Sequence, residues 1–307
     1  MPLQDKFMPE NSKVVGYYSV LGFEREPFAT SPDPEFFYHT REHDLALTNL
    51  LIELRLRRGL SVIFGDVGTG KTTLSRKLLH ELHKRGDMLF HMILNPAFSS
   101  EHQFLESLVR NFDIPTPGSF NLKTGDIYQL RDLIEKFLIQ KTLEEGRTVV
   151  LIVDEAQKLD LTTLESLRVL LNFETNSHKL IQLVLLGQLE LYAKVVHMSN
   201  FLDRISFKFT LNPLDVKETR ELIEFRIRRA GFSGQYRLFS DDAVSEIYVQ
   251  TKGYPRKITM LCHKVIKNLV IEDKRSADYD FVRMVCERDR QWLSATNSQD
   301  IETLNVA

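Results

Sequence analysis

The chain has 307 residues, of which 43% are hydrophobic and 27% are charged, and 40 basic against 42 acidic residues leave a formal net charge of -2. This composition is ordinary for a globular protein and excludes a disordered or fibrous chain. No stretch approaches the roughly 20 apolar residues that cross a bilayer, and the N-terminal residues lack the apolar core of a signal peptide. We therefore expect a cytoplasmic protein without a membrane span.

The first elements in the chain are irregular. Residues 1–15 are polar and aperiodic, which predicts a flexible leader. Residues 17–40 are rich in aromatic residues and proline, a composition typical of an irregular segment packed on a core. Leucines at helical spacing then predict a helix within residues 41–59 that stops at Gly59.

Short apolar runs alternate with amphipathic stretches through the middle of the chain. The runs predict strands at 60–64, 88–94, 148–153 and 180–186, and the stretches predict helices at 71–85, 101–111, 126–145 and 161–173. Strands that are apolar on both faces and separated by helices indicate a parallel sheet between helical layers. The predicted fold class is therefore α/β, an αβα sandwich.

The strand signal disappears after Asn212. Amphipathic segments predict four further helices at 216–231, 241–251, 256–272 and 278–293. The last residues carry few apolar side chains. We therefore predict an α/β domain over 16–211, a helical domain over 212–292 and a flexible tail over 293–307.

One loop carries a complete phosphate-binding motif. Residues 65–72 read GDVGTGKT, the Walker A pattern G-x-x-x-x-G-K-[ST], between a predicted strand and a predicted helix. The glycines let successive N–H groups point inward, and the N-terminus of the helix adds positive charge. Lys71 is expected to reach the β- and γ-phosphates of ATP, and the Thr72 hydroxyl is expected to hold Mg²⁺. The expected nucleotide-binding residues of the loop are Gly65, Asp66, Val67, Gly68, Thr69, Gly70, Lys71, Thr72 and Thr73.

A second motif supplies the acidic residues that a P-loop requires. Asp154 and Glu155 directly follow the apolar strand at 148–153, as in a Walker B motif. On their own, two acids there would fit a solvated strand end, but an intact P-loop upstream favours a catalytic pair. We expect Asp154 to hold the metal together with Thr72, and Glu155 to act as general base toward the attacking water. These residues predict a Mg²⁺-dependent ATPase that converts ATP and water to ADP and phosphate.

Several sequence segments of the chain together resemble the motifs of a known family. GDVGTGKT, LIVDEAQKL, LVLLGQLEL, LDRISFKFTLNPLD and TKGYPRKI occur in the order of the motifs of AAA+ ATPases, which join a P-loop αβα core to a C-terminal helical lid. FEREPFATSPDPEFFYHT, LGQLEL and GYPRKITMLCHKVI resemble more narrowly the ExeA or GspA-like branch, associated with type II secretion and type IV (MSHA-type) pilus systems. The resemblance covers about residues 17–290. The TnsC and TniB transposition ATPases share several of these sequence segments.

The resemblance implies roles for four further residues. Gln188 matches sensor 1, which contacts the γ-phosphate or the attacking water, and Arg256 matches sensor 2 in the lid. Arg204 matches the region that supplies an arginine finger to the ATP of a neighbouring subunit, so we expect a ring or a short helical oligomer. Asn95 matches the glutamate-switch position and is expected to hold Glu155 away from water.

Two functions stay open at this point. The first is an oligomeric ATPase that drives or regulates assembly of a secretion or pilus apparatus, with a protein client such as a membrane-bound component of that apparatus. The second is an ATP-dependent DNA-binding adaptor of the transposition type. Basic clusters at residues 55–59 and at Arg226, Arg228 and Arg229 would serve DNA phosphates, but cations in the last turn of a helix also complement its dipole. With a net charge near zero, the first function is favoured.

Overall fold

A computed structural model describes residues 16–29, 34–118 and 120–304, with side chains up to Gln291. The chain forms two compact units, His39–Asn212 and Met1–Tyr38 together with Pro213–Ala307. Residues 17–38 therefore group with the helices of the C-terminal part, whereas the sequence prediction placed them in the α/β domain. The predicted leader at residues 1–15 lies outside the described residues.

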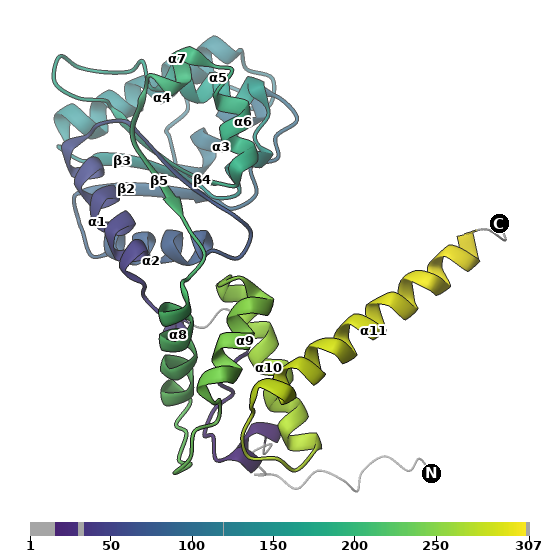
Figure 1. Cartoon of the computed structure of the whole chain (residues 1–307). Helices are drawn as coiled ribbons and strands as arrows, with labels where there is room; N and C mark the ends of the chain where they lie inside the picture. Colours follow the sequence, from purple (N-terminus) through teal and green to yellow (C-terminus); the bar gives the residue numbers. More distant parts are fainter. Residues whose placement is uncertain (1–15, 30–33, 119, 305–307) are drawn as a thin grey trace, which may run out of the picture. The chain divides into compact units, whose positions relative to one another are not determined.

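The unit His39–Asn212 is built on a five-stranded sheet in the order β2-β3-β4-β1-β5, with every pairing parallel (Figure 1). The strands are β1 (Leu60–Gly65), β2 (Met88–Ile93), β3 (Thr148–Val153), β4 (Ile181–Gly187) and β5 (Ile205–Leu211). Because all five run in the same direction, their carboxyl ends meet at one edge of the sheet. The predicted α/β fold is confirmed.

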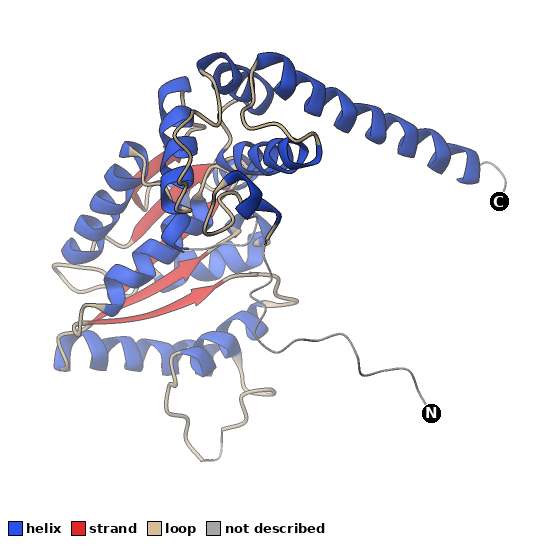
Figure 2. Cartoon of the chain, turned by 90° about the horizontal axis from the view of Figure 1, so that it is seen from below, coloured by secondary structure: helices blue, strands red, loops and turns tan. Residues whose placement is uncertain are grey.

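Helices cover both faces of this sheet (Figure 2). They are α1 (Arg41–Leu56), α2 (Lys71–His83), α3 (Glu101–Asn111), α4 (Ile127–Ile139), α5 (Leu161–Leu170), α6 (Leu189–Val195) and the short α7 (Ser199–Leu202). Successive residues of β3 alternate between the two layers: Val150 and Ile152 pack with α1 and α2, whereas Val149, Leu151 and Val153 pack with α3 to α6. This two-sided burial explains why the central strands are apolar throughout.

The second unit consists of helices and the aromatic N-terminal segment. Its helices are α8 (Val216–Arg229), α9 (Asp241–Thr251), α10 (Pro255–Ile271) and α11 (Tyr279–Leu304), and the N-terminal segment adds the 3-10 turns η1 (Tyr17–Leu21) and η2 (Pro34–Phe36). Phe23, Phe28 and Phe36 are buried in the same hydrophobic core as these helices. That shared core is why the segment belongs to this unit.

Three predicted elements differ from the structure. The sequence prediction missed β5, an edge strand in which exposed residues alternate with half-buried ones. The predicted helix at 126–145 ends at Ile139 and continues as one π-helical turn, Gln140–Glu144. The last helix, predicted to end at residue 293, continues as α11 to Leu304 and contains no glycine or proline to stop it, while the flexibility of the tail stays a prediction. Among the described helices, none is both long and apolar enough to span a membrane.

Candidate functional site

The P-loop connects the carboxyl end of β1 to the N-terminus of α2. Gly68 and Gly70 have φ angles of 87° and 104°, the left-handed region that favours glycine. A Cβ atom on Gly65 would lie 2.6 Å from Oγ1 of Thr69, and one on Gly70 would lie 2.4 Å from Nε2 of His43. Backbone conformation and space therefore both require glycine at position 70.

His43 is a neighbour of the P-loop that the sequence analysis missed. It lies in the first turn of α1, 4% exposed, and its Nδ1 is 2.6 Å from Oγ1 of Thr40, the residue that caps this helix. Burial lowers the pKa of His43, so its ring is held in the neutral form. The spacing Thr-x-x-His at a helix start was the available signal, but only the fold places the ring against Gly70.

Lys71 directs its charge into the loop. Its Nζ donates to the carbonyl oxygens of Gly65 at 2.7 Å and of Asp66 at 3.0 Å, and the residue is 5% exposed. Burial lowers the pKa of Lys71, and the nearby carboxylates of Glu155 and Asp154 act against this shift. The loop thus holds one buried ammonium group beside two acidic residues.

Asp154 is brought to Thr72, as a metal site requires. The Asp154 side chain is 2% exposed and accepts a hydrogen bond from the backbone N–H of Glu155 at 2.9 Å, and the Thr72 hydroxyl lies nearby. Burial raises the pKa of Asp154, and the backbone N–H of Glu155 and the nearby Thr72 hydroxyl oppose that rise. A carboxylate and a hydroxyl are oxygen ligands of the kind that Mg²⁺ prefers, so this pair fits the predicted metal.

Glu155 follows in a left-handed backbone conformation, with φ of 54°. Its Oε2 accepts a hydrogen bond of 2.8 Å from Nε2 of Gln157. Asn95, the predicted switch residue, instead accepts a 3.3 Å hydrogen bond from Nζ of Lys158. The structure therefore pairs Glu155 with Gln157, a residue that the sequence analysis did not single out, and the switch role of Asn95 stays a prediction.

Gln188 caps α6 at the carboxyl end of β4. Because β4 lies between β1 and β3 in the sheet, Gln188 is placed between the P-loop and the pair Asp154–Glu155. Its backbone N–H donates to Oε1 of Gln157 at 3.1 Å. The sensor 1 role of Gln188 stays a prediction.

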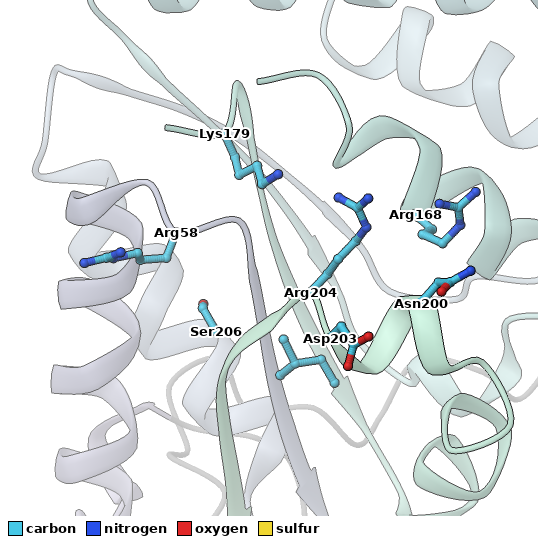
Figure 3. A pocket seen from close by; sticks show the side chains of 8 residues that line it. Arg58, Arg168, Lys179, Asn200, Asp203, Arg204 and Ser206 are labelled. Carbon is cyan, nitrogen blue, oxygen red and sulfur yellow. The ribbon is translucent and has the colours of Figure 1, made fainter. Parts of the chain in front are cut away.

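Arg204 lies at the other edge of the sheet, immediately before β5. It lines a pocket of roughly 550 Å³ together with Arg58, Arg168, Lys179, Asn200, Asp203, Ile205 and Ser206 (Figure 3). Arg58 and Lys179 precede β1 and β4, so this is the amino-end edge, opposite the P-loop. Arg168 pairs with Glu165 and Lys179 with Glu174, whereas in the described part of the chain the guanidinium of Arg204 forms neither a hydrogen bond nor an ion pair. The fold does not bring Arg204 to its own P-loop.

The other predicted cations divide between exposed and structural positions. Arg256 is exposed in the first turn of α10 in the helical unit, and its sensor 2 role stays a prediction. Arg57 donates to Thr148 and to the carbonyl of Gly146, and Arg226 donates to the carbonyl of Pro27 and lies over the rings of Phe28 and Phe36. Each basic cluster therefore contributes one arginine to the packing of its own unit.

Comparison with known proteins agrees with this arrangement. Residues 54–195 match the AAA domain family. General secretion pathway protein A of Aeromonas hydrophila is 33% identical over 252 residues, which are 81% of this chain and 44% of that protein. The chain thus spans less than half the length of this relative.

Solved structures share the fold at much lower identity. The ORC2 protein of Aeropyrum pernix, in its ADPNP-ADP complexes, aligns with a TM-score of 0.59 at 16% identity, covering 86% of this chain and 71% of that one. Drosophila ORC bound to DNA aligns with a TM-score of 0.63 at 17% identity, covering 93% and 69%. Residues 54–195 therefore carry an AAA domain on a fold that the ORC proteins share, and the predicted resemblance of the chain to the ExeA/GspA-like branch is confirmed.

Proposed function

We propose that this protein is a Mg²⁺-dependent ATPase. The observation that carries the proposal is the meeting of Lys71, Thr72, Asp154 and Glu155 at one edge of the sheet. Backbone N–H groups of the loop and the ammonium of Lys71 would bind the phosphates of ATP. Thr72 and Asp154 would hold Mg²⁺, which supplies positive charge against the phosphate oxygens.

Glu155 is the group that we assign to proton transfer. Its carboxylate is half-buried beside the proposed metal ligands Thr72 and Asp154, and it would orient the attacking water and accept its proton. Gln188, at the neighbouring strand end, would contact the γ-phosphate or the water. Glu155→Gln keeps the shape of the side chain and removes the base.

Phosphate release from Mg-ATP tests this assignment. The wild type is expected to release phosphate, and Glu155→Gln is expected to bind ATP with similar affinity while turning over on the order of 100-fold more slowly. Turnover by Glu155→Gln at the wild-type rate would remove Glu155 from the mechanism. No hydrolysis by the wild type at any protein concentration would overturn the ATPase proposal.

We further propose that the active form is an oligomer in which Arg204 reaches the ATP of a neighbouring subunit. Support comes from the position of Arg204 at the sheet edge opposite its own P-loop and from a guanidinium that forms no ion pair within the described residues. A cation supplied in trans stabilises the charge that develops on the transferred phosphoryl group.

For the biological role, we propose assembly or regulation of a secretion or pilus apparatus through a protein client. The support is the 33% identity to general secretion pathway protein A. The DNA-directed alternative has weaker support, because the likeness to DNA-bound ORC is at 17% identity and carries only the fold. Arg57 and Arg226 also serve internal contacts, which leaves fewer cations for DNA phosphates.

A further inference from the structure

The side-chain amide of Gln157 connects two parts of the candidate site. Its Nε2 donates to Oε2 of Glu155 at 2.8 Å, and its Oε1 accepts from the backbone N–H of Gln188 at 3.1 Å. A carboxylate oxygen only accepts and a backbone N–H only donates, so these partners fix which end of the amide is oxygen and which is nitrogen. One planar group therefore joins the end of β3 to the end of β4.

Contacts from α6 and from the end of β4 also hold the backbone of Gln157. Lys194, on α6, donates from Nζ to the carbonyl oxygen of Gln157 at 2.6 Å and to that of Leu159 at 2.7 Å. A Cβ atom on Gly187 would lie 3.4 Å from the backbone nitrogen of Gln157, so the end of β4 approaches this turn closely. The turn after β3 is thus attached to Gln188 and α6 through several contacts.

The backbone conformation of Glu155 has to be held in place by contacts of this kind. A non-glycine residue with φ of 54° adopts a left-handed backbone conformation that is unfavourable for residues with a Cβ atom. Such a conformation persists only where the surroundings hold it. The bond from Gln157 is the side-chain contact that fixes the carboxylate, whereas Asn95 is hydrogen-bonded to Lys158.

We propose that Gln157 is a positioning residue for hydrolysis, whose amide ties the carboxylate of Glu155 to the backbone of Gln188. The inference rests on the proposed ATPase function and deepens it. When Gln188 contacts the γ-phosphate and shifts, its backbone N–H pulls on Oε1 of Gln157. The Nε2 group of the same amide then shifts the carboxylate of Glu155. The placement of the base thereby follows the state of the nucleotide.

Two substitutions separate this role from simple support of the fold. Gln157→Leu removes both hydrogen bonds at similar volume. Gln157→Glu keeps an acceptor for the N–H of Gln188, but it loses the donor to Glu155 and places a second carboxylate beside the first. Gln140→Leu is the matched control, because Gln140 is an exposed glutamine outside the site.

The test measures ATP affinity with a fluorescent analogue and hydrolysis in single-turnover and steady-state assays. Both Gln157 variants are expected to bind ATP like the wild type and to hydrolyse it on the order of 100-fold more slowly, as a misplacement of about 1 Å does. Gln140→Leu is expected to match the wild type. In the Glu155→Gln background, either Gln157 substitution is expected to change the residual rate little, since the base on which it acts is absent.

Each other outcome has a definite meaning. Wild-type hydrolysis by Gln157→Glu would show that Gln157 only holds the backbone of Gln188, and the inference would be overturned. Weaker ATP binding by both variants would overturn it too, because Gln157 would then support the binding site as a whole. If the wild type is active and Glu155→Gln is slow while the Gln157 variants are fast, the ATPase proposal survives and the inference fails.

Discussion

The side chains of Thr72 and Asp154 lie close together, which joins the first turn of α2 to the end of β3. The two residues are 82 positions apart in the chain, so only the parallel sheet brings them together. The carboxylate and the hydroxyl that we propose as Mg²⁺ ligands therefore lie in one site, together with the buried ammonium group of Lys71.

Lys71 is the first residue to test, because its ammonium is the buried cation of the loop. Lys71→Ala is expected to abolish tight ATP binding in a fluorescent-nucleotide titration, since it removes the charge directed at the β- and γ-phosphates. Lys77→Ala is the control on the same helix: Lys77 forms a surface ion pair with Glu81, and its loss is expected to leave affinity unchanged. Equal affinity of Lys71→Ala and the wild type would contradict the assigned role.

Gly70 tests the shape of the loop. Gly70→Ala would place a methyl group 2.4 Å from Nε2 of His43 at a φ of 104°. We expect a loss of about 1–3 kcal/mol in the free energy of unfolding and weak ATP binding. Gly86→Ala is the matched control, because nothing lies within 4 Å of its added Cβ. Both variants are compared by urea denaturation and nucleotide titration, and equal behaviour of the two would refute the close contact with His43.

His43 predicts a pH dependence of stability. Burial lowers its pKa in the folded state, whereas a histidine in an unfolded chain has a pKa of about 6.5. Below that pH the unfolded state binds more protons, so this contribution to stability is full above about pH 6.5 and falls as the pH falls. His43→Gln removes the titration.

Urea denaturation at about pH 7.5 and about pH 5.5 measures this effect. The wild type is expected to lose more stability between the two than His43→Gln does, by up to about 1.4 kcal/mol per pH unit. An equal loss in both proteins would mean that His43 titrates alike in the folded and unfolded states.

Some parts of this molecule could be predicted from the sequence and others could not. The P-loop was predicted with its flanking strand and helix, because spacing and local conformation define it. The strand β5 was missed because ISFKFTL alternates between apolar and polar residues, whereas the four predicted strands are apolar runs. His43 and Gln157 were not identified from the sequence because their roles arise from contacts between elements. The aromatic segment at 17–38 was recognised as packed, but its partner core is formed by helices about 200 residues later.

Arg204 provides the prediction with the widest consequence, because it concerns assembly. Its guanidinium lies at the sheet edge opposite its own P-loop. Arg204→Ala is expected to leave ATP affinity nearly intact and to lower turnover by roughly 10³-fold or more, as the loss of an arginine finger does. Arg168→Ala is the control in the same pocket, since Arg168 is engaged by Glu165, and it is expected to keep most of the turnover.

Mixing inactive variants makes the test decisive. Lys71→Ala protomers lack a working P-loop and Arg204→Ala protomers lack the finger, so each is expected to be inactive alone. In a mixed oligomer, some interfaces pair the intact P-loop of an Arg204→Ala protomer with the intact Arg204 of a Lys71→Ala protomer. Those interfaces are expected to recover hydrolysis, and wild-type specific activity is expected to rise with protein concentration as subunits associate. An inactive mixture despite co-assembly, or full activity in a wild-type monomer, would show that Arg204 does not act in trans.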